Sequence, residues 1–157
     1  MRWSALAAVA LAGLAGLATL AMALEPSVAI RAAGGGAPTE AASGPAYVLH
    51  TLPDWVGFGG ITLGRHVFLK ASQQTPYGLG HELVHLRQLA DHPVWFWVSY
   101  LALPGWRLRW EAEAYAVHAR ARCAIDGDHG LAAYLSGPAY LWAGSREQAA
   151  AEIRAFL

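Results

Sequence analysis

The sequence contains one pattern of residue types that can bind a metal ion and activate water. It is His81-Glu82-Leu83-Val84-His85, an H-E-x-x-H sequence. Residues four apart lie on one face of an α-helix, so both imidazoles of this pattern can reach the same ion. Zn2+ with three protein ligands and one open position lowers the pKa of its bound water toward neutrality. Glu82 stands beside the two histidines and is therefore the candidate general base, and later the proton donor to the leaving group.

A third metal ligand is required, and two candidate glutamates lie on a later predicted helix. Glu111 and Glu113 are two residues apart, which places them about 200° apart around a helix, so both cannot face one ion. Glu111 shares its face with Tyr115 and His118. Because this face carries further polar groups suited to catalysis, we predict Glu111 as the third ligand and keep Glu113 as its substitute. Tyr115 and His118 are candidate catalytic residues that stabilise an oxyanion.

These residues resemble the zinc metallopeptidases of the gluzincin type. In that group H-E-x-x-H is followed by a glutamate in an E-x-x-A or E-x-x-S setting, here Glu111-x-x-Ala114, and that glutamate is the third ligand. With Gln88 and Glu111-Ala-Glu-Ala-Tyr115, the chain is also similar to small bacterial peptidase-like domains without an assigned substrate. Many gluzincins place an aspartate four residues after the third ligand to orient the first histidine. This chain has Tyr115 there, whose hydroxyl supplies no negative charge.

Turn and cap residues predict the elements that must position the motif. Short β-prone runs, the last two around a tight turn at Gly64-Arg65, predict strands at Tyr47–Leu49, Ile61–Leu63 and Val67–Leu69. Caps and helix breakers predict a helix from Thr75-Pro76 to about Ala90, a helix from Trp106 to about Ala124, and a terminal helix opened by the capping box Ser145–Gln148. The fold class is therefore α+β: a small β-sheet or hairpin followed by a mainly helical domain, which the resemblance makes zincin-like.

An aromatic-rich segment lies between the motif and the candidate third ligand. It runs from Trp95 to Leu103, is bracketed by Pro93 and Pro104, and is too short to span a bilayer. We expect a core helix packed over the motif helix. Contact with a membrane surface is the alternative, because Trp and Tyr are enriched at membrane interfaces. Cys123 is expected to be a small core residue.

Residues 1–24 form an apolar N-terminal segment, with no charged residue from Trp3 to Leu24. A signal peptide is one interpretation, because Ala21-Met22-Ala23 provides a small-x-small cleavage site. A retained membrane anchor is the other, because the run reaches the length of about 20 residues that an anchor helix needs. Both predict an N-terminal apolar helix and an exported protein of the cell envelope. The domain would be periplasmic or extracellular, or anchored with the domain outside.

The next segment, residues 25–46, is rich in Gly, Ala and Pro and is expected to be a flexible linker. The folded metallopeptidase domain would then occupy residues 47–157. With 11 basic and 11 acidic residues, the chain has no net charge to attract nucleic acid. Its one cysteine excludes an intramolecular disulfide framework and a cysteine-based zinc finger.

The interpretation favoured by these features is a zinc-dependent hydrolase, a peptidase, acting on a peptide or protein substrate. Its ligands to Zn2+ would be His81, His85 and Glu111, with Glu82 as the base. Two alternatives stay open. One is a metal-binding envelope protein that does no catalysis. The other is a membrane-associated interaction protein with no metal, in which the segment Trp95–Leu103 and the N-terminal helix make the contacts.

Overall fold

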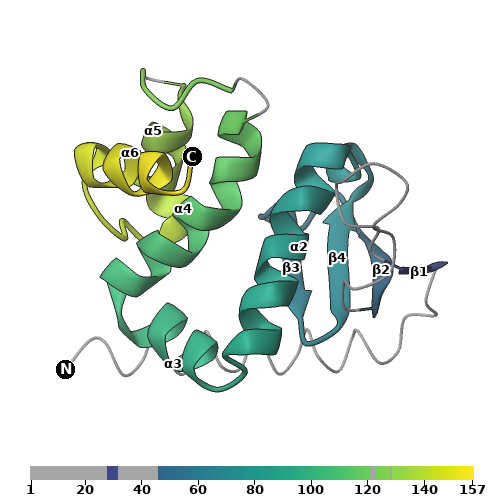
Figure 1. Cartoon of the computed structure of the whole chain (residues 1–157). Helices are drawn as coiled ribbons and strands as arrows, with labels where there is room; N and C mark the ends of the chain where they lie inside the picture. Colours follow the sequence, from purple (N-terminus) through teal and green to yellow (C-terminus); the bar gives the residue numbers. More distant parts are fainter. Residues whose placement is uncertain (1–27, 32–45, 121–122, 128) are drawn as a thin grey trace.

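The computed structural model describes residues 28–31, 46–120, 123–127 and 129–157. They form an α+β arrangement in which a small sheet stands beside a group of helices (Figure 1). The predicted N-terminal apolar helix and the cleavage site at residues 21–23 lie outside the described residues, so the expected export stays a prediction. None of the described helices combines the length and the apolar character needed to cross a membrane.

The sheet has four strands in the order β1-β2-β4-β3. The strands are β1 (Val28–Arg31), β2 (Ala46–Leu52), β3 (Gly60–Leu63) and β4 (His66–Lys70). β3 and β4 are the predicted hairpin, and its turn contains Gly64 at a φ of 59°, in the left-handed region that glycine adopts most easily. β2 pairs with β4 in parallel and with β1 antiparallel. β3 is consequently an edge strand of the sheet, a position that matters for the site.

Two described parts of the segment predicted to be a linker, residues 25–46, belong to strands. Val28–Arg31 form β1, which pairs with the start of β2 in the register Arg31↔Ala46, and β2 itself begins at Ala46. The sequence Val-Ala-Ile-Arg places β-branched residues at alternate positions, a pattern that suits a strand. The remaining residues of the predicted linker lie outside the described ranges.

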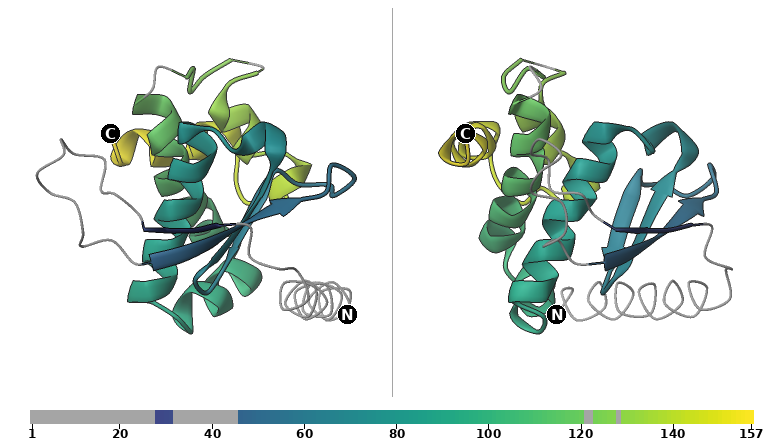
Figure 2. Two further views of the ribbon diagram at one scale, coloured as in Figure 1. Left: turned by 90° about the vertical axis from the view of Figure 1, so that its right-hand side faces the viewer. Right: turned by 45° about the vertical axis from the view of Figure 1, so that its right-hand side comes forward.

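The motif helix is α2 (Pro76–Asp91), and it begins where the sequence predicts. The Thr75 hydroxyl accepts a hydrogen bond from the backbone N–H of Gly78, and Pro76 occupies the first helical position. The helix ends just before Pro93, which cannot continue it. α2 lies on one face of the sheet (Figures 1 and 2). Its residue Leu86 forms an apolar cluster with Tyr47, Val67 and Leu69 of the sheet, and the leucines of α2 at positions 79 and 83 pack against this cluster.

The remaining described helices continue the chain away from the sheet. They are α3 (Trp95–Ala102), α4 (Pro104–Arg120), α5 (Leu131–Leu135) and α6 (Arg146–Ala155), with single 3-10 turns η1 (Ala71–Gln73) and η2 (Pro138–Tyr140). α4 begins earlier than predicted, because Pro104 serves as a first-turn residue, where its missing N–H is harmless. Its described part ends at Arg120. The capping box at Ser145 is confirmed. α4 lies beside α2 (Figure 2) and packs on α6 through a second apolar cluster that includes Leu108, Leu135 and Ile153.

The aromatic helix α3 is a core helix on one face only. Phe96 and Ser99 are buried, whereas Trp95 is 43% exposed and Val98 is 50% exposed. Phe96 packs with Leu89 of α2 and Trp110 of α4 in a third cluster, so the expected packing over the motif helix is present on that side. The prediction of a buried Cys123 is wrong. This residue is exposed beyond the end of α4, because the helix stops before it.

Candidate metal centre

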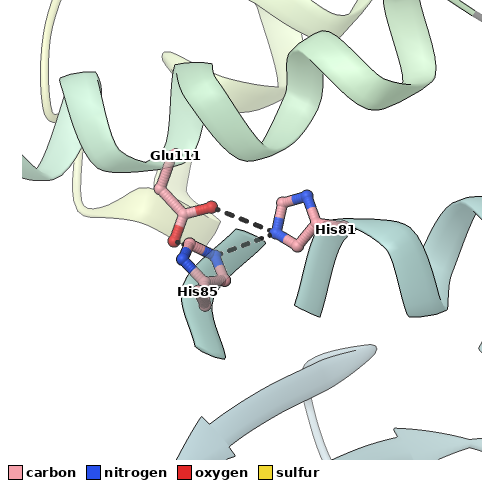
Figure 3. Close-up of side chains that lie close together, drawn as sticks. All are labelled: His81, His85 and Glu111. Atoms are coloured by element: carbon pink, nitrogen blue, oxygen red, sulfur yellow. Dashed lines mark hydrogen bonds and ion pairs between the residues drawn. The ribbon is translucent and has the colours of Figure 1, made fainter. Parts of the chain in front are cut away.

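The structure brings together His81 and His85 of α2 with Glu111 of α4 (Figure 3). The two Nε2 atoms lie 3.1 Å apart. Glu111 Oε2 lies 3.4 Å from His81 Nε2, and Glu111 Oε1 lies 3.5 Å from His85 Nε2. Two ligand atoms bound to one tetrahedral Zn2+ ion at their usual distances are about 3.3 to 3.4 Å apart. Each histidine nitrogen therefore lies at about this spacing from one Glu111 oxygen, and one ligand atom from each of the three residues lies within 4.8 Å of the other two.

Close contact between α2 and α4 places Glu111 within reach of the histidines. A Cβ atom on Gly80 would lie only 2.9 Å from Cγ1 of Val117. Glycine at this position therefore lets the two helices approach, one residue before His81. On α4, Glu111 faces the histidines, and Gly80 has a packing role in the first turns of α2, where glycine otherwise costs helix stability.

The three side chains are buried and electrically coupled. His81 is 8% exposed, His85 is 7% exposed and Glu111 is 3% exposed. Burial alone lowers the pKa of the His85 imidazole, but the Glu111 carboxylate prevails and raises that pKa to about 9. Burial alone raises the pKa of the Glu111 carboxyl, but the two histidines prevail and hold it well below its ordinary value. Without a metal, the site consequently contains a buried carboxylate paired with a protonated imidazole.

The polar atoms of the cluster fit a bound cation better than they fit one another. Among the described residues, neither Glu111 Oε2 nor His81 Nδ1 has a hydrogen-bond partner. A buried carboxylate oxygen without such a partner is unfavourable unless a positive charge compensates for it. Two imidazole nitrogens and one carboxylate oxygen form a donor set that Zn2+ accepts. The residues present therefore fit a zinc ion.

Glu113, the substitute ligand, points away from the histidine cluster. Its Oε2 accepts a hydrogen bond of 2.8 Å from Gln88 Nε2, and its Oε1 forms an ion pair with Arg87. Gln88 Oε1 in turn lies 2.8 Å from His85 Nδ1. The structure thus places Glu111 rather than Glu113 against the two histidine rings, in agreement with the choice made from the polar residues that share the face of Glu111.

Tyr100 of α3 contacts the site and was not singled out from the sequence. Its hydroxyl donates a hydrogen bond of 2.5 Å to Glu111 Oε1. Burial and the neighbouring carboxylate raise the pKa of Tyr100 well above its ordinary value, so the hydroxyl keeps the proton that it donates. Tyr100 has no spacing relation to the motif. Only the packing of α3 against α4, pinned by Arg107 Nε donating to the Tyr100 carbonyl, brings it to Glu111.

Glu82, the predicted base, is buried beside the cluster and is held by strand β3. The Thr62 hydroxyl donates a hydrogen bond of 2.7 Å to Glu82 Oε2. A Cβ atom on Gly60 would lie 2.5 Å from Glu82 Oε1, so β3 reaches the carboxylate because residue 60 has no side chain. The Glu82 carboxylate also helps to raise the pKa of His85, after the larger effects of burial and Glu111. Neither Gly60 nor Thr62 was predicted, because the contact depends on how the hairpin packs on α2.

Tyr115 and His118 both lie next to His81. The Tyr115 ring is 4.5 Å from the His81 ring, but its hydroxyl pairs with the hydroxyl of Tyr140 at 2.6 Å. The tyrosine therefore packs against the first histidine, at the position where many gluzincins have an orienting aspartate, and does not hydrogen-bond to it. The His118 ring is 5.8 Å from that of His81. Burial, followed by the charge of His81, lowers the pKa of His118, which favours a neutral imidazole at pH 7.

Comparisons with models of protein families, with curated proteins and with solved structures found no match for this chain.

Proposed function

We propose that this protein is a zinc-dependent hydrolase that cleaves peptide bonds. The observation that carries the proposal is the buried cluster of His81, His85 and Glu111, whose ligand atoms lie within 4.8 Å of one another, with the further buried carboxylate of Glu82 beside it. Three protein ligands leave one coordination position open, as in catalytic zinc sites. A bound ion would supply Lewis-acid chemistry, polarising water and the substrate carbonyl.

The chain's own residues supply the proton transfers of such a hydrolysis. Glu82 accepts a proton from the attacking water and returns it to the nitrogen of the leaving amine as the C–N bond breaks. Thr62 holds Glu82 Oε2 through its hydroxyl, so we assign the proton transfer to Oε1. His118, half-buried and neutral at pH 7, is the candidate donor to the developing oxyanion.

The edge strand β3 supports a peptide as the substrate. In the described sheet β3 pairs with β4 on one side only, and an unpaired strand edge binds an extended peptide through backbone hydrogen bonds. Gly60 and Thr62 of the same strand contact Glu82. A peptide paired along β3 would therefore have its backbone close to the proposed base.

A metal-binding protein without catalysis is the second candidate function. It is favoured by the burial of the cluster, since His81, His85 and Glu111 are each at most 8% exposed. Burial of this depth limits the access of a substrate to the cluster. The two functions differ in whether Glu82 does any chemistry.

The deciding experiment combines metal analysis with hydrolysis of a mixed peptide library by the purified protein. We expect about one equivalent of zinc in the parent and in Glu82→Gln, and a loss of hydrolysis of about 100-fold or more in Glu82→Gln alone. The matched control is Glu147→Gln, which changes an exposed glutamate of α6. Less than half an equivalent of zinc in the parent would refute metal binding. Equal hydrolysis by Glu82→Gln and the parent would refute the assigned base.

A further inference from the structure

A chain of three polar side chains connects the protein surface to the Nδ1 atom of His85. Arg87, whose side chain is 56% exposed, forms an ion pair with Glu113. Glu113 accepts from the amide nitrogen of Gln88, and Gln88 Oε1 meets His85 Nδ1 at 2.8 Å. His85 Nε2, at the other end of the ring, faces His81 and Glu111. The connection therefore ends on the nitrogen of His85 that does not face the cluster.

We propose that Glu113 is a positioning residue that acts through Gln88 to fix which nitrogen of His85 carries the proton. The inference rests on the proposed function in one respect, namely that His85 is a metal ligand. It assigns a role to the second glutamate of the E-x-E pair, which the ligand cluster does not use. Glu111 lies beside the Nε2 atoms of both histidines, whereas Glu113 acts on Nδ1 of His85 through Gln88.

The orientation of the Gln88 amide follows from the chemistry of its partners. Its nitrogen lies 2.8 Å from Glu113 Oε2 and 3.1 Å from the carbonyl oxygen of Trp110. A carboxylate and a carbonyl can only accept hydrogen bonds, so the NH2 group of Gln88 must face them. The amide oxygen then faces His85 Nδ1 and can only accept. His85 Nδ1 must therefore donate.

The tautomer of His85 follows from that donation. A neutral imidazole carries one N–H group, so a proton on Nδ1 leaves Nε2 with its lone pair free. Nε2 is the atom that faces Glu111 and that would bind the ion. If the Gln88 amide turned over, its NH2 group would face Nδ1, the proton would move to Nε2, and the ligand position would be blocked. Ligand histidines are commonly fixed in this way by a second hydrogen bond.

Glu113 makes the flipped orientation of the Gln88 amide unfavourable, because the flip would place the amide oxygen against the Glu113 carboxylate. Gln88 is 2% exposed, so water cannot replace a lost partner. Without Glu113, the Trp110 carbonyl alone would hold the amide nitrogen, at the longer distance of 3.1 Å. His81 Nδ1 has no hydrogen-bond partner among the described residues. Among the described residues, His85 therefore has a hydrogen bond at Nδ1 that fixes its ring, whereas His81 does not.

A double-mutant cycle on zinc affinity tests whether Glu113 acts through Gln88. The dissociation constant would be measured by competition with a chromophoric chelator for the full-length parent, Glu113→Ala, Gln88→Ala and the double variant. We expect Glu113→Ala to weaken zinc binding about tenfold and Gln88→Ala about 10- to 100-fold, and the double variant to match Gln88→Ala. Glu113→Gln retains an accepting oxygen and should bind nearly as tightly as the parent. The control Asp126→Ala breaks another exposed ion pair, with Arg154, and should have no effect.

A second readout does not require a bound metal. Where the His85 ring is neutral at high pH, the imidazole nitrogen signals of the metal-free protein should show the Nδ1–H tautomer in the parent and a mixture in Glu113→Ala. Multiplicative effects in the cycle, or an unchanged tautomer in Glu113→Ala, would overturn the proposal. Complete loss of zinc in Glu113→Ala with retention in Glu111→Ala would make Glu113 the ligand. A parent that binds no zinc but changes tautomer as expected would refute the proposed function and support the positioning role.

Discussion

The metal-free protein is expected to lose stability as the pH rises from 6.5 to 9. An unfolded histidine has a pKa of about 6.5, whereas that of folded His85 is raised to about 9 by Glu111, against the effect of burial. Below pH 6.5 the imidazole is protonated in both states, and the ion pair with Glu111 contributes fully. As the pH rises through 9 the folded state also loses the proton, and the contribution disappears.

The size of the effect follows from the two pKa values. Each tenfold difference in proton affinity corresponds to about 1.4 kcal/mol, so a rise in pKa from 6.5 to about 9 corresponds to about 3 kcal/mol of unfolding free energy. In a domain of this size, that is on the order of 10 °C in melting temperature. Other shifted groups do not interfere within this window. Burial raises the pKa of four tyrosines above 10 and lowers the pKa of two histidines below 6.5: Tyr47, Tyr100, Tyr115, Tyr140, His50 and His118.

The stability of the zinc-loaded protein should change with pH in the opposite direction and fall as the pH falls. A metal ligand must be deprotonated, so folded His85 carries no proton on Nε2, while the unfolded chain takes up a proton below pH 6.5. Stability of the loaded protein therefore falls as the pH falls. The assay is urea unfolding at pH 5.5, 6.5, 7.5 and 8.5, with excess chelator or with stoichiometric zinc.

The control for this prediction is Glu111→Gln, which removes the carboxylate that raises the pKa of His85. The unfolding free energy of the metal-free variant should then no longer fall as the pH rises above 6.5. Metal-free parent protein that keeps constant stability, or gains it, between pH 6.5 and 9 would show that the buried ion pair does not form. The reasoning on the electrostatics of the cluster would then be wrong.

Three substitutions test the contacts that position Glu82 and Glu111. Gly60→Ala places a Cβ atom 2.5 Å from Glu82 Oε1 and should lower kcat about tenfold or more at unchanged zinc content; an unchanged kcat would contradict the close contact. Thr62→Val removes the hydrogen bond to Glu82 Oε2 and should lower the urea midpoint by the equivalent of about 1–3 kcal/mol, whereas equal midpoints would show that the bond contributes nothing. Tyr100→Phe removes the donor to Glu111 and should weaken zinc binding about tenfold in a chelator competition, and undiminished affinity would count against that role.

Local signals in the sequence predict the motif helix and the approach of His81, His85 and Glu111 to one another. The cap at Thr75 and the breaker at Pro93 define α2. Helical geometry predicts that Glu111 and Glu113 cannot both face one ion, and the polar residues that share the face of Glu111 favour it. The structure places only Glu111 against the histidine rings. These predictions succeed because each depends on the regular rotation of one helix, which the order of residues determines.

The contacts made between elements could not be predicted in the same way. Tyr100 reaches Glu111 only because α3 folds back on α4, and Thr62 reaches Glu82 only because the hairpin packs on α2. The exposed face of α3 has the same apolar composition as its buried face, so no periodicity marks which side meets the core. The pairing of β1 with β2 is likewise a backbone contact between distant segments, which side-chain composition reports poorly.

The helices α2 and α4 each belong to a separate apolar core. One core joins α2 to the sheet, and the other joins α4 to α5 and α6. Where the two helices meet, the ligand cluster supplies polar contacts in addition to the apolar cluster of Leu89, Phe96 and Trp110. The cohesion between the two halves of the molecule therefore depends on the protonation of His85 beside Glu111, and would depend on a metal ion bound by the cluster.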